Sequence, residues 1–148
     1  PPLSGGGFRT LDFGAVVPGT TVSVAPRSAQ GAEFRIGGLL GRKSVDITLT
    51  LPAVLTGPGG ATILLNFAGA NAGSCELNVL DVCQAASLDS WNPVTSPTTR
   101  VRPIKVGKGP KVFVNDQLAL SLGASISPPS TQRAGRYTAS ATVVIVAN

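Results

Sequence analysis

Hydrophobic and polar residues alternate with a period of two along most of the chain. This alternation predicts β-strands, because successive side chains of a strand point to opposite faces of a sheet. The segment 137–145 shows it over the greatest length and most cleanly, and 45–51 has apolar residues at its odd positions with polar residues between them. Further runs of this kind cover 22–24, 34–36, 61–67, 77–79, 104–106, 112–114 and 118–122. No window has the repeat of an amphipathic helix.

Turn-forming residues separate these runs. Pro18-Gly19, Gly37-Gly38 and the stretches 57–60 and 107–110 are rich in Gly and Pro. Because Asn and Asp tolerate left-handed backbone, Asn115-Asp116 predicts a tight hairpin between the runs 112–114 and 118–122. About nine short strands at regular spacing predict an all-β fold, an antiparallel β-sandwich of immunoglobulin-like form.

The length suits one domain over residues 1–148. Two stretches depart from the alternating pattern. Residues 1–10 contain three consecutive glycines and are expected to form a flexible N-terminal arm. Residues 69–100 hold both cysteines and the single tryptophan, and are expected to form an elaborated loop with a short hairpin at 77–82.

Composition excludes several classes of protein. The chain has 18 Gly and 12 Pro among 148 residues, which excludes a coiled coil or a long-helix bundle because both residues terminate helices. Hydrophobic residues make up 43% and charged residues 13%, which excludes intrinsic disorder. There is no His, so the chain cannot build a Ser-His-Asp or Cys-His catalytic arrangement or a His-ligated zinc site.

Other features predict an exported protein. The chain has no Met, so Pro1 is expected to follow a cleavage event, and no stretch approaches the roughly 20 apolar residues of a membrane-spanning helix. We therefore expect an extracellular or cell-surface location after removal of a signal peptide. In an exported chain Cys75 and Cys83 would form a disulfide that closes a short loop. The alternative is two buried free thiols.

The formal net charge is +5, but the basic residues are dispersed. The densest clusters are Arg42-Lys43 and the spread set Arg100, Arg102, Lys105, Lys108 and Lys111. Aromatic residues make up only 5% of the chain, so the interleaving of basic and aromatic side chains typical of nucleic-acid-binding surfaces is missing. We interpret the charge as solubilising and expect no nucleic-acid partner.

The carboxylates show no catalytic arrangement, because no close pair lies in a loop beside aromatic residues. They are Asp12, Glu33, Asp46, Glu76, Asp81, Asp89 and Asp116. Asp12 and Asp46 alternate with apolar residues and are expected to face solvent. Asp81 and Asp89 leave calcium binding open, although their spacing matches no calcium-loop motif. We expect no enzyme, no cofactor and no metal.

Three sequence segments occur together in a recognisable order. The first is LDFGAVVPG at 11–19 followed by TVSV at 21–24, and the second is AEFRIGG at 32–38 running into VDITLTLP at 45–52. The third is FVNDQL at 113–118, then AGRYTA at 134–139 and a closing strand. Over roughly 8–67 and 110–148, the chain resembles a family of bacterial exported domains of unassigned function. More distantly, it is similar to spore-coat-U-type pilins of archaic chaperone–usher systems.

This resemblance implies an exported immunoglobulin-like domain that, in the pilin relatives, is an incomplete sandwich. There the missing strand comes from the N-terminal extension of a neighbouring subunit, and identical subunits polymerise into a filament. The resemblance also implies a periplasmic chaperone during export. The usual Gly-Gly before the penultimate strand is replaced here by Asn115-Asp116.

A final strand with nothing to cover it suits a groove that accepts a neighbour's strand. Its candidate lining is Tyr137, Ala139, Ala141, Val143 and Ile145. The candidate donor is another alternating set: Leu11, Phe13, Ala15 and Val17. Two alternatives remain open. Residues 1–8 could reach over as hinge and anchor, or the domain could complete itself without exchange.

The favoured function is a structural subunit of a bacterial extracellular pilus-like filament, a homopolymer assembled head to tail by N-terminal strand exchange. The main alternative is a self-complete surface adhesin or carbohydrate-binding module. Trp91 would be its stacking platform, although a lone Trp more often anchors a loop against the core. A third class is a viral coat or tail component, because β-sandwiches also tile capsids.

Overall fold

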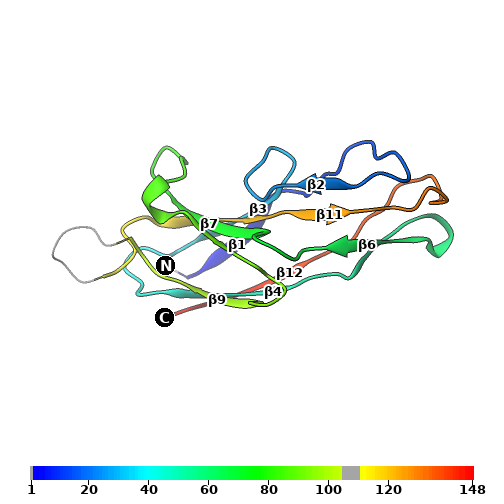
Figure 1. Cartoon of the computed structure of the whole chain (residues 1–148). Coiled ribbons are helices and arrows are strands. Elements are labelled where there is room, and N and C mark those ends of the chain that lie inside the picture. The colour runs from blue at the N-terminus through cyan, green and yellow to red at the C-terminus, as the bar shows by residue number, and fades with distance from the viewer. Residues whose placement is uncertain (1, 105–110) are drawn as a thin grey trace.

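The computed structural model describes residues 2–104 and 111–148, and the described chain is almost entirely β-strand (Figure 1). The strands are β1 (Ser4–Arg9), β2 (Val22–Val24), β3 (Ala32–Gly37), β4 (Val45–Thr50), β5 (Val54–Thr56), β6 (Thr62–Asn66), β7 (Ala72–Leu77), β8 (Asp89–Trp91), β9 (Thr98–Val101), β10 (Gln117–Leu122), β11 (Ala124–Ile126) and β12 (Thr142–Ala147). Two short 3₁₀ turns, η1 (Pro58–Gly60) and η2 (Ala85–Ser87), lie in the connections. The predicted all-β class is confirmed.

The strands form three sheets in which every pairing is antiparallel. The five-stranded sheet has the order β1-β3-β10-β7-β8, the four-stranded sheet β2-β11-β6-β5 and the three-stranded sheet β12-β4-β9. Their packing forms an elongated sandwich (Figure 1). β1 and β12 each stand at the edge of a sheet.

Gly123 joins the five-stranded sheet to the four-stranded sheet. It lies between β10 and β11, and a Cβ at this position would be 2.2 Å from the carbonyl oxygen of Val24. The chain bends here and passes close to the backbone of β2, and only glycine fits at such a close approach.

The core lies between the sheets and follows the predicted alternation most closely in β4. Val45, Ile47 and Leu49 are buried, while the residues between them are partly or fully exposed. The largest fully buried apolar side chains are Phe113, Ile36, Leu39, Ile47, Leu118, Leu120 and Val45.

The prediction of an elaborated loop over 69–100 is wrong. β7 occupies the interior of the five-stranded sheet, and all six of its residues are buried. The predicted Cys75–Cys83 disulfide is confirmed. It holds the segment after β7 over the outer face of the sheet, where Cys75, Leu77 and Ala119 form a second small apolar cluster. Since both faces of β7 are covered, its sequence lacks alternation.

Two further expectations are corrected. Residues 4–9, expected within a flexible arm, form β1 and pair with β3. The hairpin at Asn115-Asp116 is absent, because residues 112–114 are not in a strand. The turn at 107–110, Val106 of the run 104–106, Lys105, Lys108 and Pro1 lie outside the described residues.

Replacing both cysteines, as Cys75→Ala with Cys83→Ala, is expected to lower the free energy of unfolding by about 2–3 kcal/mol, because the crosslink restricts the unfolded chain. Urea unfolding of the variant and of the wild type measures the difference. Reduced wild-type protein should show a loss of similar size. An unchanged free energy would contradict a stabilising role for the crosslink.

Candidate functional site

A large apolar groove opens along one side of the sandwich, with a volume of about 1090 Å³. Residues 7–14 form one wall and residues 132–141 form the other. The floor is made of hydrophobic side chains from the sheets: Phe34, Leu55, Ile63, Leu65, Phe67, Leu122 and Ile126. The groove therefore lies between a segment near the N-terminus and the segment that leads into β12.

A smaller hollow of about 300 Å³ adjoins the groove, because Gly7 and Phe34 line both. It lies between β1 and β12, and its lining includes Gly5, Val143 and Ile145. The Cδ1 atom of Ile145 is 3.0 Å from the position that a Cβ on Gly5 would occupy. The two edge strands therefore face each other across a space that glycine leaves partly empty.

The candidate acceptor residues all line these two spaces. Tyr137, Ala139 and Ala141 line the groove, whereas Val143 and Ile145 line the smaller hollow. The predicted strand 137–145 is shorter than expected, because β12 begins only at Thr142. Before it, Thr138 makes an isolated bridge to Thr56.

Tyr137 fixes this part of the wall. Its hydroxyl donates a hydrogen bond to the carbonyl oxygen of Arg133 at 2.5 Å and accepts one from Nε2 of Gln132 at 2.8 Å. Its ring lies against Gly57, where a Cβ would be 2.6 Å away. The aromatic ring thus forms the part of the groove wall that lies beside the turn η1.

The candidate donor residues divide into two pairs. Leu11 and Phe13 are half-buried, line the groove and pack against the core of their own chain. Ala15 and Val17 are exposed, and Val16 lines the groove instead. The predicted alternation fails here because Gly14 has a φ of 69°, which turns the backbone before Ala15. No strand forms over 11–17.

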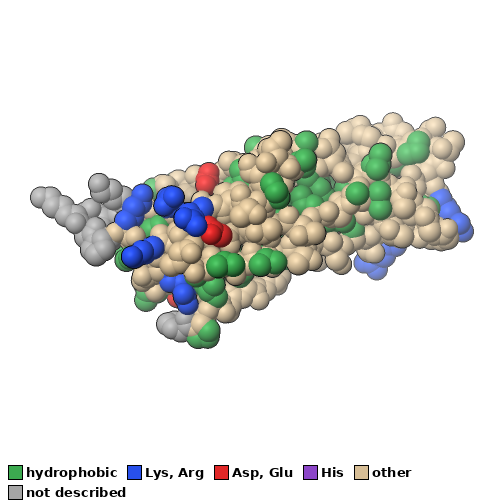
Figure 2. Space-filling view, turned by 90° about the horizontal axis from the view of Figure 1, so that it is seen from below, with side chains coloured by type: hydrophobic (Ala, Val, Ile, Leu, Met, Phe, Trp, Pro, Cys, Tyr) green, Lys and Arg blue, Asp and Glu red, His purple; other side chains and the backbone are tan. Residues whose placement is uncertain are grey.

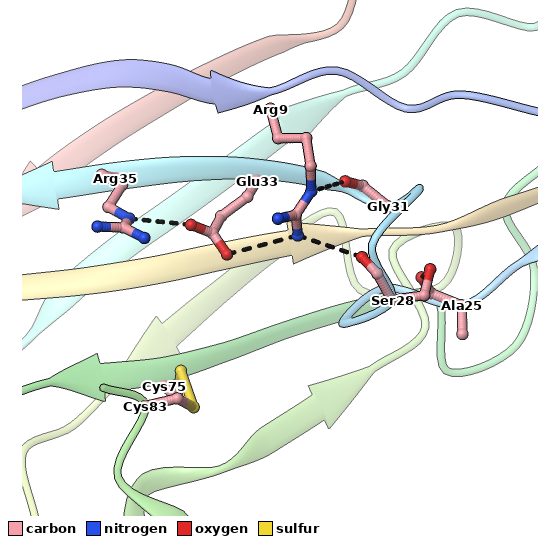
Figure 3. Close-up of polar contacts among 8 residues, drawn as sticks. All are labelled: Arg9, Ala25, Ser28, Gly31, Glu33, Arg35, Cys75 and Cys83. Carbon is pink, nitrogen blue, oxygen red and sulfur yellow. Dashed lines mark hydrogen bonds and ion pairs between the residues drawn. A yellow bond between two sulfur atoms is a disulfide. The ribbon is translucent and has the colours of Figure 1, made fainter. Parts of the chain in front are cut away.

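Arg9, which the sequence analysis did not single out, anchors the N-terminal wall (Figure 3). Its Nε donates to the carbonyl oxygen of Gly31 at 2.9 Å, and its Nη2 donates to that of Ser28 at 3.2 Å. Its guanidinium also lies 3.7 Å from a carboxylate oxygen of Glu33. The turn that carries Gly31 and Ser28 is not adjacent in sequence, so spacing alone gave no indication of this anchor.

Glu76 is a second residue that the sequence did not reveal. Its side chain is fully buried in β7, and its two oxygens accept hydrogen bonds from the backbone N–H of Ile104 and from Nδ2 of Asn115. A buried carboxylate needs such donors to offset its desolvation. Glu76 therefore holds the two ends of the segment 104–115 against the five-stranded sheet.

Trp91 does not stand exposed as a platform for a sugar. It is half-buried in β8 and packs against the core, and its Nε1 is buried without a hydrogen-bond partner among the described residues. Asp81 and Asp89 join no group of metal-ligand side chains, since the described residues contain no cluster of three or more His, Cys, Asp or Glu that could hold a metal.

Basic side chains do not form one continuous stripe on the face seen in Figure 2. Lys and Arg gather toward both ends of the molecule there, and hydrophobic side chains are visible along the stretch between. No helix in the described part of the chain is long and apolar enough to cross a membrane.

The C-terminal end of β12 is held by polar contacts to β4. Nδ2 of Asn148 donates to Oγ of Ser44 at 3.2 Å and to Oδ2 of Asp46 at 3.4 Å. Arg100 of β9 donates two hydrogen bonds to the Asp46 carboxylate, at 2.7 and 3.0 Å. These donors, Arg100 above all, lower the pKa of Asp46 below its ordinary value, and the carboxylate raises the pKa of Arg100.

Comparison with family models, curated proteins and solved structures found no match for this chain. The family resemblance stated from the sequence segments therefore stays a prediction.

The pKa of Asp46 gives a test of the contact between β4 and β9. A carboxyl whose folded-state pKa is depressed stabilises the fold above its ordinary pKa of 3.8 and loses that contribution as the pH falls through the folded-state value. Asp46→Asn should therefore unfold more easily than wild type above pH 3.8, and the difference should shrink below it. Urea unfolding over a pH series measures this.

Arg100→Ala provides the matched variant, because it removes the main cause of the pKa shift and leaves the carboxylate in place. In this variant the free energy of unfolding should change less with pH in the acidic range than it does in the wild type. Parallel profiles for all three proteins would show that the Asp46–Arg100 contact does not stabilise the fold.

Proposed function

We propose that the chain is a non-enzymatic structural subunit of a bacterial extracellular filament. Identical subunits join head to tail when an N-terminal segment of one enters the groove of the next. The observation that carries this proposal is the groove itself, whose apolar floor lies between an N-terminal wall and the segment leading into β12. An added strand could bury apolar side chains there and satisfy backbone groups at an open edge.

The position of Leu11 and Phe13 supports the proposal further. Both side chains already line the groove in their own chain, so this segment fits the apolar floor. Identical chains can exchange an identical element without new kinds of contact, and this is a low-cost route to assembly. Full burial of such a side chain contributes about 1.5–3 kcal/mol, and Leu11 and Phe13 are half-buried in their own chain.

The competing functions have less support. The packing of Trp91 against the core favours its role as an anchor over a sugar-stacking platform. No observation favours a viral coat or tail component. Export to the cell surface remains part of the proposal, and the Cys75–Cys83 disulfide is compatible with it.

A pair of neighbouring valines in β12 tests the groove. Val143 lines the smaller hollow, whereas Val144 points away and is 48% exposed. Val143→Asp should abolish filaments, because it places a charge in an apolar joint, and Val144→Asp should leave them intact. Electron microscopy of native material scores filament formation.

Thermal unfolding of both variants checks that each still folds. Continuous density passing from one subunit into the groove of the next would identify the donor residues in wild-type filaments. Discrete particles for the wild type, or normal filaments of folded Val143→Asp, would overturn the groove model.

A further inference from the structure

β1 is a strand with very few side chains. Gly5, Gly6 and Gly7 make up half of it, and a Cβ on Gly6 or Gly7 would meet no atom within 4 Å. Glycine in a strand loses more conformational entropy on ordering than any other residue and gives no side chain to pack. The glycine part of β1 is therefore held mainly by its backbone ladder with β3.

Side-chain anchoring of β1 is concentrated where the glycines end. A bulge separates Gly7 from Arg9 in the pairing with β3. Beyond it, Arg9 holds two backbone carbonyls and the carboxylate of Glu33 (Figure 3). The guanidinium of Arg35 lies 3.8 Å from the centre of the Phe8 ring and donates to Glu33 at 2.9 Å. We call Phe8 and Arg9, with Glu33 and Arg35, the latch.

The latch is partly shielded from water, which strengthens it. The Glu33 side chain is only 14% exposed, and it lies between the guanidinium groups of Arg9 and Arg35. Hydrogen bonds to charged groups in such places contribute more than exposed ion pairs do. Loss of the latch would leave the glycine part of β1 held by its backbone ladder with β3 and by Leu3, which packs against the core just before the strand.

β1 covers the edge of β3 next to the groove. β3 pairs with β10 on its other side, so a strand that enters from another subunit can join β3 only after β1 has left. The smaller hollow between Gly5–Gly7 and Val143 and Ile145 shows that β1 fills this place incompletely. The same chain therefore provides a partner for its own edge, but a weakly packed one.

We infer that β1 is a self-complementing strand that closes the free subunit, and that the latch controls its release during assembly. The incoming strand is residues 3–18 of a second copy, because this segment already fits the edge and the groove in its own chain. This inference rests on the proposed strand exchange. The rate at which two subunits join is then limited by release of the latch and not by the rate at which the subunits meet.

A labelled peptide of residues 3–18 takes the place of the incoming strand. Its sequence stays wild type while the full-length subunit is varied, so any change in binding comes from the subunit that accepts the strand. Fluorescence anisotropy in a stopped-flow instrument measures how fast the peptide binds. Arg9→Ala should raise the binding rate about tenfold, since two part-buried hydrogen bonds and an ion pair are lost. Arg102→Ala changes an exposed arginine that lines neither hollow and should leave the rate unchanged.

Gly6→Val tests the opposite direction. Its backbone is not left-handed and its Cβ has free space, so a β-branched residue there should stabilise β1. It should slow peptide binding several-fold. Hydrogen exchange of the β1 amides should rise in Arg9→Ala and fall in Gly6→Val. If Arg9→Ala does not fold, Phe8→Ala takes its place, because it removes the ring that contacts the Arg35 guanidinium and should also raise the binding rate.

The outcomes separate the two proposals. Binding at one common rate to all four subunits, or faster binding to Gly6→Val, would overturn the latch and leave strand exchange standing. Such rates would be expected if the incoming strand pairs with the outer edge of β1, because β1 would then not have to leave. Failure of the peptide to bind any subunit would overturn strand exchange and the latch with it. Binding that is fastest for Arg9→Ala, intermediate for the wild type and slowest for Gly6→Val supports both the latch and strand exchange.

Discussion

The edge of β3 is the constraint on which the open side of this molecule depends. Backbone N–H and C=O groups at a sheet edge need partners, and each one left buried and unpaired costs about 1–3 kcal/mol. Phe34 of β3 lines both hollows and Ile36 lines the smaller one, so this edge lies beside apolar space. In the single chain β1 covers this edge, and β1 is itself exposed along most of its length.

The N-terminal segment both pairs with the edge of β3 and covers part of the apolar groove. β1 supplies backbone hydrogen bonds through residues that have almost no side chains, whereas Leu11 and Phe13 supply apolar surface without forming a strand. Asp12 lies between them, and its N–H donates to the carbonyl oxygen of Gln30. Because both functions lie in one continuous piece of chain, a neighbouring copy could deliver them together. This makes the N-terminal segment the element whose exchange needs the fewest new contacts.

Sequence reasoning succeeded where one face of a strand is covered and the other is wet. The alternation of β4, β6 and β12 survives in the structure as alternating burial. It failed for β7, because a strand covered on both faces has no alternation to detect. The alternation of 118–122 did predict β10, although five of its six residues are buried. Sequence reasoning also failed for Ala15 and Val17, where the positive φ of Gly14 changes which side chains point inward.

The candidate site divides in the same way. Periodicity identified the groove-lining residues of the C-terminal segment, since each lies at alternate positions of one stretch of chain. Arg9 and Glu76 were not identified, because their partners come from distant turns that only the folded topology brings near. Buried polar contacts of this kind leave no local pattern in a sequence.

Charge also limits how subunits could join. Figure 2 shows Lys and Arg side chains toward both ends of the molecule. Arg133 and Arg136 line the groove near the turn η1, whereas Arg42 and Lys43 follow β3 at the end where Asn148 lies. A head-to-tail joint would bring two basic ends together, and like charges oppose such contact within about 10 Å at moderate ionic strength. Attraction between the ends therefore does not drive a joint of this kind. The joint must instead be held by apolar burial in the groove and by pairing at the edge of β3. The free subunit already makes both kinds of contact with its own N-terminal segment, and exchange transfers them to a neighbour.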